Sequence, residues 1–249
     1  MTESTRLAEL REGLDAVRRR IETACEQAGR DQGEVTLVAV TKFFPTSDIE
    51  LLAELGVTDV GESRDQEAAG KVAELPEQVR TALRVHFVGQ LQSNKARSVA
   101  RYADVVHSLD RAKLVGSLDR AAGAAREAGE RATYLQVLVQ VDLEQGEGDR
   151  TGRGGVPPQE LSALAERVAA TEHLQLRGVM AIAPLGLDDS GTGAALQRLA
   201  RCSEQVREIE PDARWISAGM SDDLEVAVAA GATHLRVGTA ILGSRPTAR

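Results

Sequence analysis

VTLVAVTK, residues 35–42, is a continuous run of apolar and β-branched residues that closes on a lysine. Such a run is typical of a strand buried on both faces, as in a parallel sheet covered by helices. The residues that follow, 47–50, have the spacing of a helix capping box, and Gly56 is placed to end that helix. A strand followed at once by a helix predicts an α/β protein.

The same alternation continues to the end of the sequence. Eight strand-like runs occur, at 35–42, 57–63, 84–90, 105–110, 134–143, 176–183, 214–221 and 234–243. Helical patterns separate them, for example at 158–171 and 222–230. Eight β/α units with short connections predict a single (β/α)8 TIM barrel. An open doubly wound sheet is the alternative, but it usually has fewer strands and often a glycine-rich loop after the first strand, and residues 41–45 contain no glycine.

The first thirty residues precede this alternation. Their apolar side chains recur every three or four positions, which predicts one long amphipathic helix; they are Leu7, Leu10, Leu14, Val17, Ile21 and Ala24. We expect residues 1–249 to form a single domain, with a leading helix at 1–30 that plugs or flanks the barrel bottom and the barrel at 31–246. The longest polar stretch, 144–155, is either a mobile lid or an insertion.

Composition narrows the classes of partner. Among 249 residues 42% are apolar and only 2% aromatic, so the core must be aliphatic. The net charge of −8 argues against nucleic acid or an anionic membrane surface as a partner, although one anion can still bind in a locally positive pocket. Cys25 and Cys202 have no spacing of a zinc site and predict free thiols. Without a signal sequence or a membrane-spanning apolar stretch, we expect a cytoplasmic protein.

Two features suggest the chemistry of one site. Lys42 falls at the carboxyl end of the first strand, where barrels place their active sites and where an amine can condense with a carbonyl. Loops seven and eight of such barrels often bind phosphate, and Ser221, placed as a helix N-cap, Gly238 and Thr239 fall there. A rim salt bridge for the lysine, and plain packing or capping roles for the others, are the alternatives. Together a carbonyl-reactive lysine and a phosphate cup describe pyridoxal 5′-phosphate (PLP).

Arg236 adds a constraint, because it shares a strand face with Gly238. It is placed either to hydrogen-bond the pyridine nitrogen of PLP or to form a surface ion pair. Arginine stays charged and would keep that nitrogen unprotonated, which disfavours transamination. His86 is interpreted as a core or barrel-bottom residue rather than a base, and Asp59 has no evident partner in the sequence.

Six motifs, in order, carry a resemblance to a known family: AVTK (39–42), GESRDQE (61–67), HFVGQLQSNK (86–95), GVMAIAP (178–184), SAGMSDD (217–223) and RVGTAILG (236–243). From about residue 5 to residue 246 the sequence resembles the pyridoxal phosphate homeostasis protein family, relatives of the alanine racemase N-terminal barrel. The resemblance implies a barrel of PLP fold type III, a Schiff base on Lys42, phosphate contacts in loops seven and eight, and Arg236 near the pyridine nitrogen. It predicts no catalytic or metal residue and this cofactor-binding set: Lys42, Ser63, Asn94, Ser217, Gly219, Met220, Ser221, Arg236, Gly238 and Thr239.

Departures from the family's pattern bear on function. The family usually has asparagine where this sequence has Ser63, and the stretch 144–155 is longer than usual. Racemases of this fold take a second base, a tyrosine, from an added β-domain, and we expect no such domain because the sequence ends soon after strand eight. Tyr102 and Tyr134 are not at the expected rim.

The sequence therefore favours a monomeric PLP carrier in vitamin B6 homeostasis, without dedicated catalysis, that serves apo PLP-dependent enzymes. An amino-acid racemase and a class I aldolase-like lyase, which would use Lys42 directly on a sugar phosphate, are the alternatives.

Overall fold

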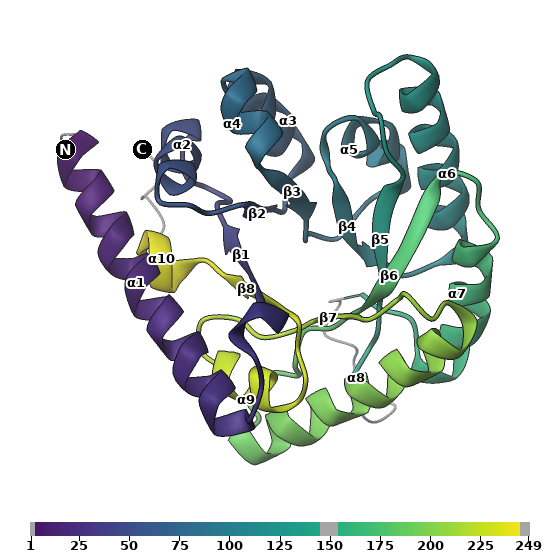
Figure 1. Ribbon diagram of the computed structural model, residues 1–249. Coiled ribbons are helices and arrows are strands. Elements are labelled where there is room, and N and C mark those ends of the chain that lie inside the picture. The colour runs from purple at the N-terminus through teal and green to yellow at the C-terminus, as the bar shows by residue number, and fades with distance from the viewer. Residues whose placement is uncertain (1–2, 145–153, 245–249) are drawn as a thin grey trace.

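The computed structural model describes residues 3–144 and 154–244, and in them eight parallel strands close into a barrel in sequence order (Figure 1). The strands are β1 (Thr36–Val40), β2 (Asp59–Glu62), β3 (Arg84–Phe87), β4 (Val105–Leu109), β5 (Leu135–Gln140), β6 (Leu174–Met180), β7 (Trp215–Ser217) and β8 (His234–Val237). The barrel closes because β1 pairs with β8 as well as with β2. The predicted (β/α)8 barrel is confirmed, and one strand falls at each predicted run, although β6 begins at Leu174, two residues before its run.

Helices surround the barrel on the outside (Figure 1). They are α1 (Glu3–Ala28), α2 (Thr46–Glu54), α3 (Asp65–Glu74), α4 (Glu77–Ala82), α5 (Ala96–Tyr102), α6 (Ala112–Glu127), α7 (Leu161–Ala169), α8 (Asp189–Ile209), α9 (Leu224–Ala229) and α10 (Thr239–Leu242), with short 3₁₀ turns η1 (Gln32–Glu34), η2 (Ser93–Lys95) and η3 (Pro158–Glu160). The core between strands and helices is aliphatic, as the composition requires, with Phe87 the largest fully buried side chain.

The leading helix α1 lies along the outer wall of the barrel, beside α2, α9 and α10 (Figure 1). Its predicted apolar stripe is buried there. Gly13 permits a close approach, because a Cβ at that position would lie 2.6 Å from the carbonyl oxygen of Ile241. Arg20 pairs with Glu225 of α9 at 2.7 Å. The helix therefore flanks the barrel, which is one of the two arrangements that the sequence left open.

Two helix starts differ from the sequence prediction. Helix α2 begins at Thr46, with Pro45 in the N-cap position and no side-chain cap, so the predicted capping box is wrong. The carboxylate of Asp48 instead accepts hydrogen bonds from Arg6 of α1. Helix α9 begins at Leu224, so Ser221 is not its cap. At Asp48 the contact with α1 outweighs the local capping preference.

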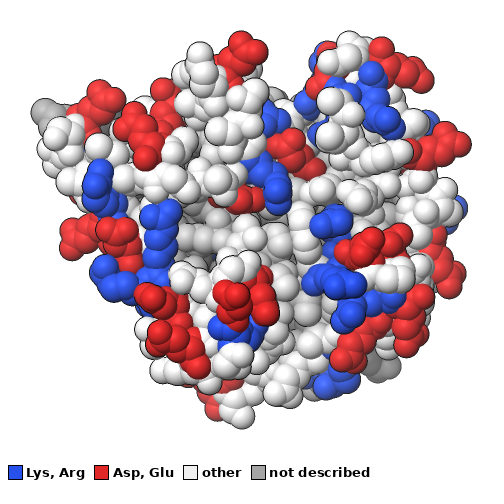
Figure 2. Space-filling view, in the orientation of Figure 1, with Lys and Arg blue, Asp and Glu red and all other residues white. Residues whose placement is uncertain are grey.

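The surface and the thiols agree with the composition. Both cysteines are free and buried. On the face seen in Figure 2, acidic and basic side chains are intermixed around a central area of uncharged residues. Within residues 3–144 and 154–244, no helix combines the length and apolarity that crossing a membrane requires.

Candidate functional site

A cavity of about 260 Å³ opens where the carboxyl ends of β1, β7 and β8 meet, and we call it the rim pocket. Six of the ten predicted cofactor residues line it: Lys42, Met220, Ser221, Arg236, Gly238 and Thr239. The sequence did not predict its other walls, which include the apolar side chains of Val40, Phe44, Val88 and Ile182 and the carboxylate of Asp222. Amine, guanidinium and hydroxyl groups thus share one small, largely apolar space.

The backbone that carries Lys42 is held on both sides. The next residue, Phe43, has a positive φ of 73°, which is uncommon outside glycine and costs free energy unless contacts impose it. Its N–H donates to Glu67 Oε1 at 2.5 Å. Lys71 Nζ donates to the carbonyl oxygens of Thr41 and Phe44, at 3.0 and 3.1 Å. The loop is therefore fixed from below by α3.

Lys71 is itself buried between two carboxylates. Its Nζ lies 2.6 Å from Glu62 Oε1 and 2.9 Å from Glu67 Oε1, and Thr41 also donates to Glu62 at 2.7 Å. Burial raises the pKa of Glu62, although the charge of Lys71 opposes it. Burial also opposes ionisation of Glu67, but hydrogen bonds from Lys71 and Phe43 outweigh it and lower its pKa. The sequence did not predict this buried cluster of Lys71, Glu62 and Glu67. The cluster fixes the position of the backbone from which the Lys42 side chain extends.

Glycines bring the backbone close on the opposite side of the rim pocket. Gly219 has φ 87°, and a Cβ there would lie 2.6 Å from the Cβ of Ala227. Its carbonyl accepts from the Arg236 N–H at 2.9 Å. At Gly238 a Cβ would lie 3.1 Å from the Val40 carbonyl oxygen. Ser221 Oγ lies beside this turn, 3.4 Å from the N–H of Ala240. Hydroxyls and tightly turned backbone of this kind suit an anion.

Arg236 is buried under the rim pocket. Its Nη1 donates to Ser217 Oγ at 2.6 Å and its Nη2 to the carbonyl of Ala181 at 2.9 Å. Burial lowers the pKa of Arg236 to about 10, with the charge of Asp223 opposing, so the guanidinium stays charged at neutral pH. Within the described residues it forms no direct ion pair with a carboxylate, which excludes the surface ion pair considered from sequence.

The family model of the alanine racemase N-terminal domain matches residues 13–246, which is most of the sequence. The chain belongs to the alanine racemase N-terminal domain family. The resemblance that the six motifs carry is confirmed by curated relatives named pyridoxal phosphate homeostasis protein. That of Mycobacterium tuberculosis is 44% identical over 247 residues, covering 96% of this chain and 94% of the relative. That of Pseudomonas aeruginosa is 38% identical over 239 residues, covering 96% and 97%.

Solved structures agree with the family assignment. PipY of Synechococcus elongatus, solved with PLP bound, is 33% identical with a TM-score of 0.77, and the match covers 94% of this chain and all of PipY. Alanine racemase of Corynebacterium glutamicum shares the fold alone, at 17% identity and a TM-score of 0.65, and this chain covers 62% of that enzyme.

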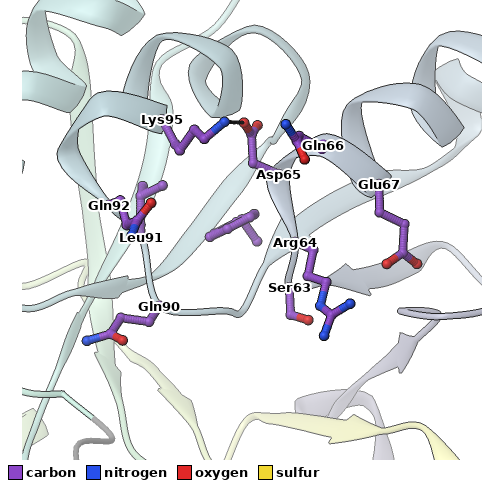
Figure 3. Close-up of a pocket in the computed structure, with 10 residues that line it drawn as sticks. Ser63, Arg64, Asp65, Gln66, Glu67, Gln90, Leu91, Gln92 and Lys95 are labelled. Carbon is purple, nitrogen blue, oxygen red and sulfur yellow. Dashed lines mark ion pairs between the residues drawn. The ribbon is translucent and has the colours of Figure 1, made fainter.

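Two residues predicted from the family motifs lie away from the rim pocket. Ser63 lines a second cavity, of about 510 Å³, at the ends of β2 and β3. Figure 3 shows it beside Arg64, across this cavity from the ion pair that Lys95 forms with Asp65 at 3.6 Å. Asn94 is exposed on η2 and lines neither cavity. Their contact with a cofactor stays a prediction.

Ser217 and Gly219 support the rim pocket from beneath, through Arg236, rather than lining it. Ser217 is also hydrogen-bonded to a set of polar side chains inside the barrel, which the sequence did not predict. His107 Nδ1 lies 2.9 Å from its Oγ, His107 Nε2 lies 2.8 Å from His86 Nδ1, and His86 Nε2 lies 2.8 Å from Asp59 Oδ1. The expectation that Asp59 lacks a partner is therefore wrong. The available signal was polar residues inside strands that are otherwise apolar.

Burial also lowers the pKa of every histidine inside the barrel. We call His86, His107 and His234 the barrel histidines. For His234, which lies against Trp215 with ring centroids 4.3 Å apart, the value falls to about 3. Among the described residues, no three histidine, cysteine or acidic side chains are grouped so as to hold a metal ion.

Proposed function

We propose that this protein binds PLP for intracellular PLP homeostasis and delivery, with the cofactor held on Lys42 in the rim pocket. The observation that carries the proposal is the convergence of an amine, a polar cradle and a buried guanidinium on one cavity. The relatives named for pyridoxal phosphate homeostasis and the PLP-bound PipY support it independently.

The rim pocket fits PLP by size and by chemistry. Its volume, about 260 Å³, is just below the usual range of about 300–1,000 Å³ for ligand sites, which suits one small cofactor. Apolar walls at Val40, Phe44 and Ile182 suit a flat ring. The turn at Gly238 would be narrowed by any side chain, which suits a bulky anion close to the backbone.

Each polar group then has a role that its chemistry allows. Lys42 would hold the cofactor through its amine, because PLP when bound would supply an aldehyde with which an amine can condense, with the loss of one water. Ser221, Gly238 and Thr239 offer hydroxyl and backbone donors for the phosphate. Arg236 offers donors only, so it favours an unprotonated acceptor on the ring.

Storage and delivery fit the rim pocket better than racemisation. A racemase needs a second base opposite the lysine. Tyr102 is buried in α5, where burial raises the pKa of its hydroxyl, and Tyr134 is half exposed just before β5. Neither lines the rim pocket. We therefore propose a monomeric cytoplasmic carrier whose recipients are apo PLP-dependent enzymes.

The test is the colour of the purified protein with PLP. Wild type is expected to be yellow, and borohydride should fix the cofactor to the peptide that contains Lys42. Lys42→Ala should abolish both signals. Lys95→Ala is the matched control, because this lysine lies at the second cavity and pairs with Asp65.

Other outcomes favour the alternatives. Rapid racemisation of alanine by the wild-type protein would favour an amino-acid racemase. A colourless protein trapped by borohydride only in the presence of a sugar phosphate would favour an aldolase-like lyase.

A further inference from the structure

A row of five hydrogen-bonded side chains crosses the barrel interior beneath the rim pocket. The polar row consists of Arg236, Ser217, His107, His86 and Asp59. All five are buried, and the two histidines and Ser217 are fully inaccessible to solvent. One end, Arg236, lines the rim pocket, and the other, Asp59, lines a separate cavity at the amino ends of β1 and β2. The row thus connects the two ends of the barrel.

The proton positions along the polar row follow from its two ends. A guanidinium only donates hydrogen bonds and a carboxylate only accepts them. Asp59 must therefore accept from His86 Nε2, which leaves Nδ1 of a neutral His86 to accept from His107 Nε2. A neutral His107 then accepts at Nδ1 from the Ser217 hydroxyl, while Ser217 accepts from Arg236. Every donor points away from Arg236 and toward Asp59.

The opposite arrangement requires a second proton on His86. In that case His86 Nδ1 would donate to His107, and His107 would donate to Ser217. Burial disfavours an imidazolium at this position and lowers the pKa of His86, although the hydrogen bond to Asp59 opposes it. The charges of Arg84 and Asp104 also act on His86, in opposite directions. For His107, burial and the positive charge of Arg236 lower the pKa together.

We propose that Asp59, His86, His107 and Ser217 are positioning residues for Arg236, with Asp59 as the acceptor that fixes the direction of the polar row. Within the described residues the buried guanidinium touches no carboxylate, and the charge of Asp223 acts on it without direct contact. Asp59, which also lies 3.7 Å from Arg84, anchors the far end of the polar row and so fixes the direction of its hydrogen bonds. With one nitrogen held by Ser217 and another by Ala181, the guanidinium plane has a single orientation toward the rim pocket. The consequence for PLP rests on the proposed function, whereas the proton arrangement does not.

The first test uses the protein without PLP. Long-range ¹H–¹⁵N NMR of ¹⁵N-histidine protein distinguishes ring tautomers, and the sequence holds only four histidines to assign. His86 and His107 should both be neutral and carry the proton on Nε2. In Asp59→Asn, which keeps an oxygen acceptor but loses the charge, His86 should no longer be a single tautomer. A proton on Nδ1 of either histidine in wild type, or a charged ring at neutral pH, would overturn the proposal.

The second test uses the PLP-loaded protein. Ser217→Ala should weaken PLP binding by about tenfold, a factor that corresponds to about 1.4 kcal/mol, and should shift the absorbance maximum of the bound cofactor. Ser217→Thr, which restores the hydroxyl, should recover both. Ser108→Ala is the matched control, because Ser108 is equally buried in β4 and its Oγ has no hydrogen-bond partner.

Wild-type affinity and spectrum in Ser217→Ala would refute the positioning role. If Ser217→Ala does not fold, Asp59→Asn takes its place in the same comparison. A wild-type protein that takes no PLP on Lys42 would instead refute the proposed function, and the tautomer measurement would still decide the polar row.

Discussion

Replacing Lys71 with methionine tests how strongly the loop that carries Lys42 is fixed. The change keeps much of the side-chain volume but removes the charge between Glu62 and Glu67. Glu62 is only 1% exposed, so its carboxylate would be left buried with the hydroxyl of Thr41 but without the charge of Lys71. Removing one partner of a buried ion pair costs about 3–5 kcal/mol. At about 2–4 °C per kcal/mol for a protein of this size, the melting temperature should fall by about 10 °C.

The pH dependence of this loss has a definite sign. Because burial raises the pKa of Glu62 and Lys71 opposes that rise, removing Lys71 raises it further. A carboxyl whose folded pKa is raised destabilises fully above that pKa and not at all below its unfolded pKa of about 4.3. The defect of Lys71→Met should therefore shrink as the pH falls toward that value.

Urea unfolding at pH 7 and at pH 5, followed by circular dichroism, measures both effects. Glu62→Gln combined with Lys71→Met should recover much of the lost stability, because neither charge is then buried. Lys113→Met, at an exposed position of α6, is the control and should stay within about 0.5 kcal/mol of wild type. A Lys71→Met protein within about 1 kcal/mol of wild type at pH 7 would show that the buried group contributes little to holding the loop.

Three further results are expected. Gly178→Ala should lower the free energy of unfolding in urea by about 3 kcal/mol or more, because a Cβ would lie 1.9 Å from the Trp215 carbonyl oxygen at a φ of 145°; an unchanged unfolding midpoint would contradict this. Gly238→Ala should weaken PLP binding in a fluorescence titration with little change in melting temperature, because its Cβ would press on Val40 at the rim pocket. An unaltered affinity would contradict a phosphate site at Ser221, Gly238 and Thr239. The barrel histidines have lowered pKa values, so below pH about 6.5 the unfolded chain takes up protons that the folded one does not, and stability should fall by up to about 1.4 kcal/mol per pH unit for each. Urea unfolding at pH 7.5 and 5.5 checks this, and equal stability at both would contradict it.

The barrel could be predicted because its signal is local and repeated eight times. A buried parallel strand needs a run such as residues 35–40 whatever surrounds it. Helix starts were predicted less well, since a distant residue decides them. Asp48 looks like part of a capping box, but Arg6 binds it from α1. No pattern within four residues contains that information.

In the candidate site, too, features set by local sequence could be predicted and features set by distant contacts could not. Lys42 and Gly238 could be placed at the rim because the end of each barrel strand has a known position. The hydrogen bonds of Asp59 to His86 and of His86 to His107 could not be predicted, because the three residues come from different strands and only the register of the barrel brings them together. Motif membership alone was also a weak guide to position, since Asn94 shares a motif with residues of β3 yet lies exposed on η2.

The pairing of β1 with β8 has a consequence for biosynthesis. Lys42 leaves the ribosome early, whereas Arg236 and Gly238 are among the last residues of the barrel to be made. If the proposed function holds, a nascent chain displays the amine of Lys42 before the residues of β8 that would bind the phosphate have been made. Chains interrupted before β8 would carry Lys42 but lack Arg236 and Gly238. Binding of the cofactor would then show that the whole barrel had been translated.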